Sequence, residues 1–224
     1  MLRTSAVIAA ALILGPLSAR AADLTTKSAP LAAPQFSWTG AYVGAGFGFM
    51  SGEVIGPGTA GNNVGGTTTY FEVNGGYRYQ IPYGLVLGFD LSAPVWISSS
   101  TFNSPLGAGF STSKPQFILI PQVQLGYALG RYLPYFGVGV GVADLKGGFT
   151  TAAGTSFSDT QLSPVVDLSF GVDYALTDNW IIGVRYDHLD FEQHNYTFAT
   201  PGLPTVVQVG AVSDGVSGIV RYKF

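Results

Sequence analysis

The sequence predicts an all-β fold, an eight-stranded antiparallel up-and-down transmembrane β-barrel with short periplasmic turns and four longer external loops. Three observations lead to this prediction. Charged residues make up only 10% of the 224 residues, whereas an average soluble domain has about 25%. Apolar side chains alternate with glycine or polar side chains along most of the chain, as they do when the two faces of a strand meet different surroundings. The segments between these stretches are by turns short and long, which is typical of outer-membrane barrels.

The first 21 residues have the features of a secretory signal peptide. The positive charge of Arg3 precedes an apolar, alanine-rich run over 4–18. The small residues Ala19 and Ala21 then form a cleavage site. A membrane anchor is the alternative, but the run is shorter than the roughly 20 residues that a spanning helix needs. We therefore expect residues 1–21 to be removed during export.

Residues 22–36 are expected to form an extended periplasmic lead-in, because Pro30 and Pro34 stand among small residues there. Residues 37–224 are expected to form the barrel. This part of the chain contains no run of 18 apolar residues. Strands rather than helices are therefore expected to cross the membrane.

Eight segments of the barrel alternate with period two, and most offer roughly the 9–11 residues that cross a bilayer when tilted. In chain order they are 38–50, 70–79, 85–91, 117–129, 136–142, 166–174, 180–186 and 216–224. Each segment is defined by apolar residues on one face, here in chain order Phe47, Phe71, Leu87, Val123, Val138, Phe170, Val184 and Val220. The opposite faces carry, in the same order, Gly46, Glu72, Asp90, Gln122, Gly139, Asp167, Arg185 and Arg221.

The joins between these segments alternate in length. The short joins lie at 81–84, 130–132 and 175–179. The long joins, rich in Gly, Ser, Thr and Asn, lie at 52–67, 98–114, 144–160 and 190–208. In outer-membrane barrels the short turns are periplasmic and the long loops are external.

The alternation alone leaves two kinds of barrel open, a soluble lipocalin-like barrel and a membrane barrel. A soluble barrel would turn outward the face that here is rich in glycine and poor in charge. Such a face has too few charges to solvate a soluble exterior. It does fit the interior of an eight-stranded barrel, which side chains just fill. The apolar face is therefore expected to contact lipid.

The candidate functional site is a charged network on the inward face. Its expected members are Glu72, Arg78, Asp90, Asp167, Asp173, Arg185, Asp187 and Arg221, with Lys223 as a further candidate. Charges in a narrow interior must be paired or hydrated. Two interpretations remain open: a salt-bridge network that fills the barrel, and a narrow selective pore.

Aromatic residues gather next to the short joins, and Trp and Tyr prefer the headgroup level of a membrane because one edge is apolar and the other polar. The expected girdle consists of Tyr77, Tyr79, Tyr127, Tyr174 and Trp180. At the opposite ends of the strands the sequence places Phe47, Phe49, Phe71 and Phe117.

Composition argues against several other classes of function. The chain has no cysteine, which excludes disulfides and thiolate metal sites. Its net charge of −3 argues against a nucleic-acid partner. The two histidines, His188 and His194, lack the spacing of a helical metal site and are expected in a solvated loop. No metal and no cofactor are expected.

Two stretches of the mature chain resemble the alphaproteobacterial outer-membrane porin family, which has an OmpA-like, opacity-type eight-stranded barrel. One stretch is Ala22-Asp23-Leu24 followed by Phe36-Ser37-Trp38-Thr39-Gly40-Ala41-Tyr42-Val43-Gly44. The other is the C-terminal Val220-Arg221-Tyr222-Lys223-Phe224. The resemblance implies that Val220, Tyr222 and Phe224 form the signal read by the barrel-assembly machinery. It also implies abundant envelope proteins with structural roles and, in some members, host contact or haem binding.

The residues and the resemblance together predict a non-enzymatic barrel of the bacterial outer membrane. Its expected role is structural support of the envelope, with the interior filled by salt bridges and the loops exposed at the surface. A narrow porin for small solutes is the first alternative. A lipid-modifying outer-membrane enzyme, with His188 as its candidate residue, is the second. The expected partners are outer-membrane lipid or lipopolysaccharide and the assembly machinery, and the loops could also contact an extracellular ligand or a host.

Overall fold

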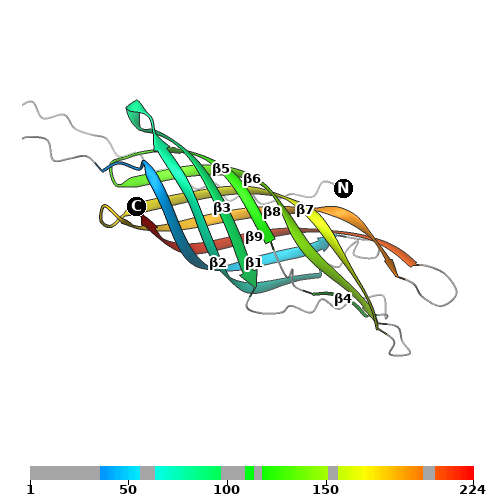
Figure 1. The fold of residues 1–224 in the computed structure, drawn as a ribbon. Helices are drawn as coiled ribbons and strands as arrows, with labels where there is room; N and C mark the ends of the chain where they lie inside the picture. The colour runs from blue at the N-terminus through cyan, green and yellow to red at the C-terminus, as the bar shows by residue number, and fades with distance from the viewer. Residues whose placement is uncertain (1–35, 56–63, 97–108, 114–117, 151–155, 199–204) are drawn as a thin grey trace, which may run out of the picture. The chain divides into compact units, whose positions relative to one another are not determined.

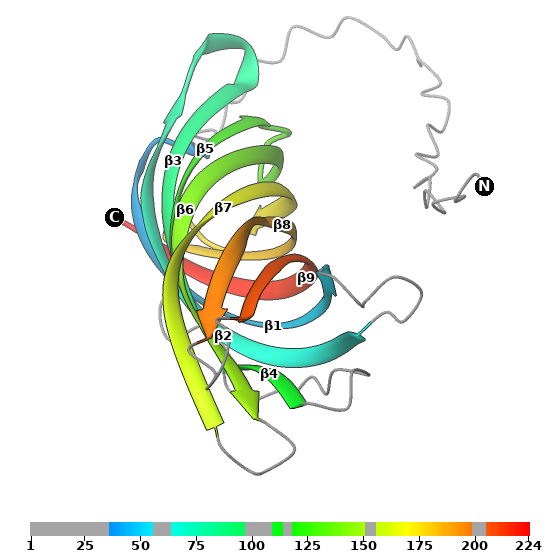
Figure 2. The ribbon, with the colours of Figure 1, turned by 90° about the vertical axis from the view of Figure 1, so that its right-hand side faces the viewer.

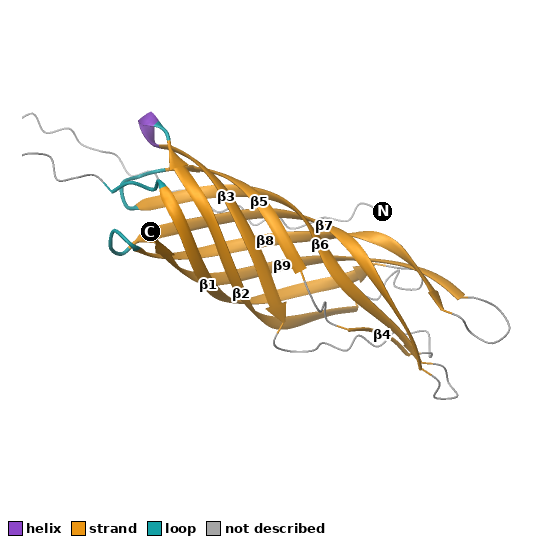
Figure 3. Cartoon of the chain, in the orientation of Figure 1, coloured by secondary structure: helices purple, strands orange, loops and turns teal. Residues whose placement is uncertain are grey.

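The computed structural model describes residues 36–55, 64–96, 109–113, 118–150, 156–198 and 205–224. The expected signal peptide and all of the lead-in except Phe36 lie outside these residues, as does Phe117. Almost all of the described chain is strand (Figure 3). The strands are β1 Gly40–Ile55, β2 Val64–Gln80, β3 Leu85–Trp96, β4 Gly109–Ser113, β5 Ile118–Tyr127, β6 Tyr132–Thr150, β7 Ser156–Ala175, β8 Trp180–Phe198 and β9 Thr205–Lys223 (Figure 1).

Eight of these strands form a closed antiparallel ring. Each pairs with the next along the chain in the order β1, β2, β3, β5, β6, β7, β8 and β9, and β9 pairs back onto β1. Figure 2 shows the strands curving around the interior. The predicted fold, an eight-stranded up-and-down barrel, is confirmed. Closure leaves no open sheet edge in the ring, as a lipid environment requires.

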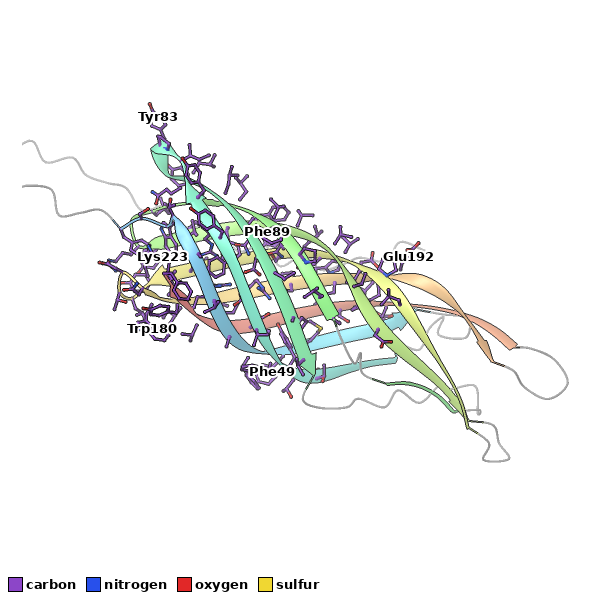
Figure 4. The ribbon with its side chains drawn as sticks, in the orientation of Figure 1. Phe49, Tyr83, Phe89, Trp180, Glu192 and Lys223 are labelled. Atoms are coloured by element: carbon purple, nitrogen blue, oxygen red, sulfur yellow. The ribbon has the colours of Figure 1, made fainter. Side chains whose placement is uncertain are left out.

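The faces of the strands follow the predicted alternation. Phe47 lies opposite Phe71 across β1 and β2, and both side chains are exposed on the outer wall. Asp90 on β3 and Arg221 on β9 are fully buried inside. In Figure 4, Phe49, Phe89 and Trp180 project from the outer surface. The apolar face therefore points outward and the small and polar face inward.

All four expected long joins contain more strand than predicted, and in the join 52–67 strand β1 runs to Ile55 and β2 begins at Val64. Residues 144–160 are mostly paired, because β6 runs to Thr150 and β7 begins at Ser156. Residues 190–208 are likewise mostly paired between β8 and β9, with a register shift between Phe191 and His194. The join 98–114 contains β4, which pairs with the outer end of β6. Backbone pairing does not depend on hydrophobicity, so strands continue past the point where the apolar alternation ends.

The short joins are tight turns, as expected. The β2–β3 turn is a single 3₁₀ turn, Pro82–Gly84, in which Tyr83 has φ 73°. A positive φ is uncommon for a residue other than glycine, and Tyr83 projects from the tip of this turn, almost fully exposed (Figure 4). In the β5–β6 turn Gly130 takes φ 64°, which costs glycine little. Within the described residues no helix has the length and hydropathy needed to cross a membrane.

Candidate functional site: the barrel interior

The barrel interior contains a polar layer near its middle. Its buried side chains come from β2, β3, β5, β7, β8 and β9 and are Glu72, Asn74, Arg78, Asp90, Ser92, Gln122, Gln124, Asp167, Ser169, Asp173, Arg185, Asp187, Ser217 and Arg221. All eight residues that the sequence analysis assigned to the inward charged network lie in this set. Buried charges are stable only when they are paired and hydrogen-bonded, so their individual contacts decide what the layer can do.

Arg185 is the centre of one cluster. Its Nη2 lies 2.5 Å from Glu72 Oε2 and its Nε lies 2.7 Å from Asp187 Oδ1. Its Nη1 lies 3.9 Å from Asp90 Oδ1. The Arg185 guanidinium on β8 therefore contacts carboxylates on β2 and β3, and β8 pairs with neither of these strands. The planar guanidinium has five N–H donors, which suits it to bind several carboxylates at once.

Asp173 is the centre of a second cluster. Its Oδ2 lies 2.6 Å from Arg78 Nη1, and its Oδ1 lies 2.7 Å from Arg221 Nη1. The Arg78 guanidinium also lies over the ring of Tyr42, 4.9 Å from its centroid. Tyr42 donates a hydrogen bond of 2.6 Å to Asp90. Tyr42 therefore joins this cluster to the cluster around Arg185.

Asp167 is the one predicted member that the structure does not bring to a guanidinium. Gln122 Nε2 donates to Asp167 Oδ2 at 2.7 Å and also lies 2.8 Å from Ser169 Oγ. Gln124 Nε2 donates to Gln122 Oε1 at 2.8 Å, and Arg78 donates to Gln124 Oε1 at 3.1 Å. This chain of amides links Asp167 to the rest of the layer. In the described part of the chain, no arginine or lysine forms an ion pair with Asp167.

An apolar layer lies inside the barrel at the end with the short turns. Its members are Phe36, Trp38, Val86, Leu133, Ala175 and Ile181. Trp38 Nε1 donates to the carbonyl of Gly130 at 3.1 Å, and its backbone N–H donates to Gln80 Oε1 at 2.9 Å. The rings of Phe36 and Trp38 meet edge to face. At the same end, Lys223 Nζ donates to the carbonyl of Ser37 at 2.6 Å, so this candidate contacts the segment before β1 and forms no part of the central clusters.

A second apolar layer lies inside the barrel toward the opposite end. It consists of Met50, Tyr70, Ile118, Ile120, Ala143, Val165, Leu189 and Phe191. Both apolar layers differ from the interior predicted from the sequence, which contained only small and polar residues. The signal was present in the alternation itself, which puts Trp38 and Tyr42 on the same face as Gly44 and Gly46.

Glycines on the inner face make room for the large side chains of the polar layer. A Cβ atom at Gly171 would clash with the ring of Tyr135, and one at Gly183 would clash with the carboxylate of Asp173. The strand neighbours on the outer face are large and exposed: Phe170 and Val172 beside Gly171, and Ile182 and Val184 beside Gly183. The glycine-rich face thus matches a crowded interior rather than an open one.

The outer wall carries the predicted aromatic residues next to the short turns. Tyr77, Tyr79, Tyr127 and Trp180 are about half exposed. Tyr174 packs on Tyr132, with ring centroids 4.6 Å apart. At the C-terminus the rings of Trp180, Tyr222 and Phe224 follow one another edge to face.

His188 also lies on the outer wall. Its Nδ1 is 2.8 Å from Asp214 Oδ1, whereas the adjacent Asp187 points inward to Arg185. The side chain of His194 lies outside the described part of the chain. Among the described residues, no group of three His, Cys, Asp or Glu side chains could hold a metal ion.

A closed ring of eight strands, an apolar outer wall and a short-turn end rich in Tyr and Trp define a transmembrane β-barrel of the bacterial outer membrane. The chain belongs to the outer membrane protein beta-barrel domain family, which matches residues 8–212. The family and the location expected from the sequence are thereby confirmed, and the protein resides in the outer membrane of a Gram-negative bacterium.

Several individual proteins are similar to this chain. The 31 kDa outer-membrane immunogenic protein of Brucella melitensis biotype 1 is 28% identical over 222 residues, which cover 85% of this chain and 88% of the relative. The outer membrane protein OprG of Pseudomonas aeruginosa has a similar fold, with a TM-score of 0.50 at 16% identity, covering 83% of this chain and 96% of that one. Neisserial surface protein A aligns with a TM-score of 0.46 at 17% identity, covering 83% and 98%.

Proposed function

We propose that this protein is a non-enzymatic structural barrel that supports the outer membrane, with an interior closed to solutes. The observation that carries the proposal is that three buried layers of side chains follow one another along the interior. A polar layer lies between two apolar layers. Side chains just fill the interior of an eight-stranded barrel. Arg185 forms an ion pair with Glu72, and Asp173 forms ion pairs with Arg78 and Arg221, across this interior. Arg185 and Asp173 are both almost completely buried.

Conductance in a planar bilayer tests the closed interior directly. The mature chain, refolded and inserted, is expected to give no discrete current steps. Trp38→Ala tests the short-turn layer, because it removes the largest side chain of that layer. Trp180→Ala is its matched control, because it truncates a side chain of the outer wall. If the unmodified barrel gives steps of constant size that disappear in Arg185→Ala, the narrow-pore interpretation replaces this one.

The name of the Brucella relative, an outer-membrane immunogenic protein, supports surface exposure of the external ends and a non-enzymatic role. Mass analysis of lipid A from cells with and without the protein tests for lipid modification. We expect identical profiles. A difference that is lost in His188→Ala would support the enzyme alternative instead.

The envelope role is tested in a deletion strain. We expect greater sensitivity to detergent and increased vesicle shedding, restored by the unmodified gene. Assembly requires that the barrel-assembly machinery recognises the chain. We assign the recognised signal to the exposed side chains of Val220 and Tyr222 at the end of β9 and of Phe224, which follows this strand. Outer-membrane lipid is the partner of the apolar wall in this proposal. A strain that behaves like the parent in both assays would contradict the structural role.

A further inference from the structure

A row of polar side chains crosses the outer wall on four neighbouring strands. Ser51 on β1 lies opposite Thr67 on β2 and opposite Asp214 on β9, and Asp214 lies opposite His188 on β8. Each of these positions is on the outward face of its strand. On the next strand, β7, the row ends at the apolar Leu168.

The middle of this row is a hydrogen-bonded cluster. Asp214 Oδ1 accepts a hydrogen bond of 2.5 Å from Tyr186 Oη and lies 2.8 Å from His188 Nδ1. When His188 Nδ1 donates this bond, the imidazole is held in one orientation and its Nε2 is left for another partner. About half of the Asp214 side chain remains exposed. The cluster therefore offers both an acceptor and an oriented ring nitrogen to the surroundings of the barrel.

The height of the row places it at the external edge of the lipid-facing wall. Asp214 is eight residues along β9 from Tyr222, which lies beside Trp180 in the girdle. At about 3.3 Å per residue and a strand tilt of 35–45°, this corresponds to about 19–22 Å. The apolar band of such barrels is about 25 Å tall. The row thus lies where acyl chains give way to headgroups.

Apolar side chains lie directly on the membrane side of the row. Phe49 and Val216 are opposite each other, and the ring of Phe49 meets that of Phe47 edge to face at 5.5 Å. Phe49 and Val216 are more than half exposed. In Figure 4, Phe49 projects from the outer surface, further from the short-turn end than Trp180. The wall therefore presents an apolar surface and a polar row next to each other.

We propose that this row binds the sugar headgroup of an outer-leaflet glycolipid, whose acyl chains lie over Phe47, Phe49 and Val216. Sugar hydroxyls donate to carboxylates and accept from hydroxyl and imidazole groups, and this row offers all three. It contains no arginine or lysine, which are the residues that bind phosphate best, so the sugar rather than the phosphate is the recognised part. The inference rests on the lipid contact proposed above and is independent of whether the interior conducts.

Lipid-dependent stability tests this site. The refolded barrel is titrated in one detergent with purified lipopolysaccharide of truncated sugar chain, or with phosphatidylglycerol. The readouts are the number of lipids retained in native mass spectra and the temperature at which the folded gel band is lost. We expect selective retention and stabilisation by the glycolipid. Asp214→Asn and His188→Ala should weaken that retention about tenfold, the change expected when a hydrogen bond to a charged group is lost.

Asp144→Asn is the matched control, because Asp144 also lies near the external end of its strand, β6, but away from the row. It should retain the glycolipid like the unmodified barrel. Equal retention of both lipids in every variant would overturn the glycolipid site and leave the general lipid contact standing. Retention of neither lipid would instead overturn the proposed lipid contact itself.

Discussion

Asp173 is the position at which a small change should disturb the barrel most, because one carboxylate neutralises two buried guanidinium groups. Its two oxygens lie 2.6 and 2.7 Å from Arg78 and Arg221, and none of the three side chains is exposed by more than 2%. Asp173→Asn conserves the shape of the side chain but removes the charge and turns an N–H₂ group toward one guanidinium. Two positive charges then remain without this counterion.

The expected cost follows from the burial of this cluster. Removing one partner of a buried ion pair typically lowers the free energy of unfolding by about 3–5 kcal/mol. For a barrel of this size, that corresponds to a melting temperature lower by about 6–20 °C. We expect this effect in urea unfolding of the refolded barrel and in the temperature of the gel-mobility shift.

Asp178→Asn is the internal control for this measurement. Asp178 forms an ion pair of 3.0 Å with Arg131, but its side chain is 81% exposed. Exposed pairs contribute about 0–1 kcal/mol, so the control should unfold almost like the unmodified barrel. If Asp173→Asn costs no more than Asp178→Asn, then water reaches the polar layer and the closed interior is wrong.

Three further predictions concern packing and assembly. Gly171→Ala should lower the free energy of unfolding by about 1–3 kcal/mol, because the added Cβ would clash with Tyr135. The added Cβ of Gly218→Ala meets nothing within 4 Å, so this control should stay within about 0.5 kcal/mol of the unmodified barrel. Equal effects of the two variants in urea unfolding would contradict a crowded interior. Trp38→Ala should cost about 3–5 kcal/mol in the same assay, and an unchanged stability would show that the short-turn layer contributes nothing. Deletion of Phe224 should reduce the folded protein recovered from outer-membrane fractions, and normal recovery would exclude it from the assembly signal.

The alternation of side chains predicted which residues face inward, because it is a local property of each strand. Asp173 and Arg221 are both correctly placed by counting two residues at a time along β7 and β9. The same rule also places Trp38 inward, but only small and polar inward residues were expected, so the inward face was not extended to this large aromatic residue. Composition cannot show that two ends of an interior are apolar when only its middle is charged.

The pairing of individual charges could not be predicted. Arg185 and Glu72 are 113 positions apart in the chain and meet across the barrel. Their contact depends on the stagger of the strands around the ring, which sets the height of each residue in the interior. The sequence therefore predicts the members of the network, but the partners follow only from the closed structure. The contact between His188 and Asp214 was missed for the same reason, since their strands pair only after β9 has returned along the barrel.

The charges in turn determine the stagger of the strands, because lipid places little constraint on it. A slip of one residue would turn the apolar wall inward and is excluded by the membrane. A slip of two residues conserves both faces, so neither the lipid nor the backbone hydrogen bonds strongly oppose it. It would, however, move one partner of each cross-barrel pair by about 6.6 Å, which is more than twice the 2.6–2.7 Å ion-pair distances of Asp173. The ion pairs of the two clusters joined by Tyr42 can thus all form together in only one strand register. The polar layer therefore selects this register among the registers that have the same lipid-facing wall.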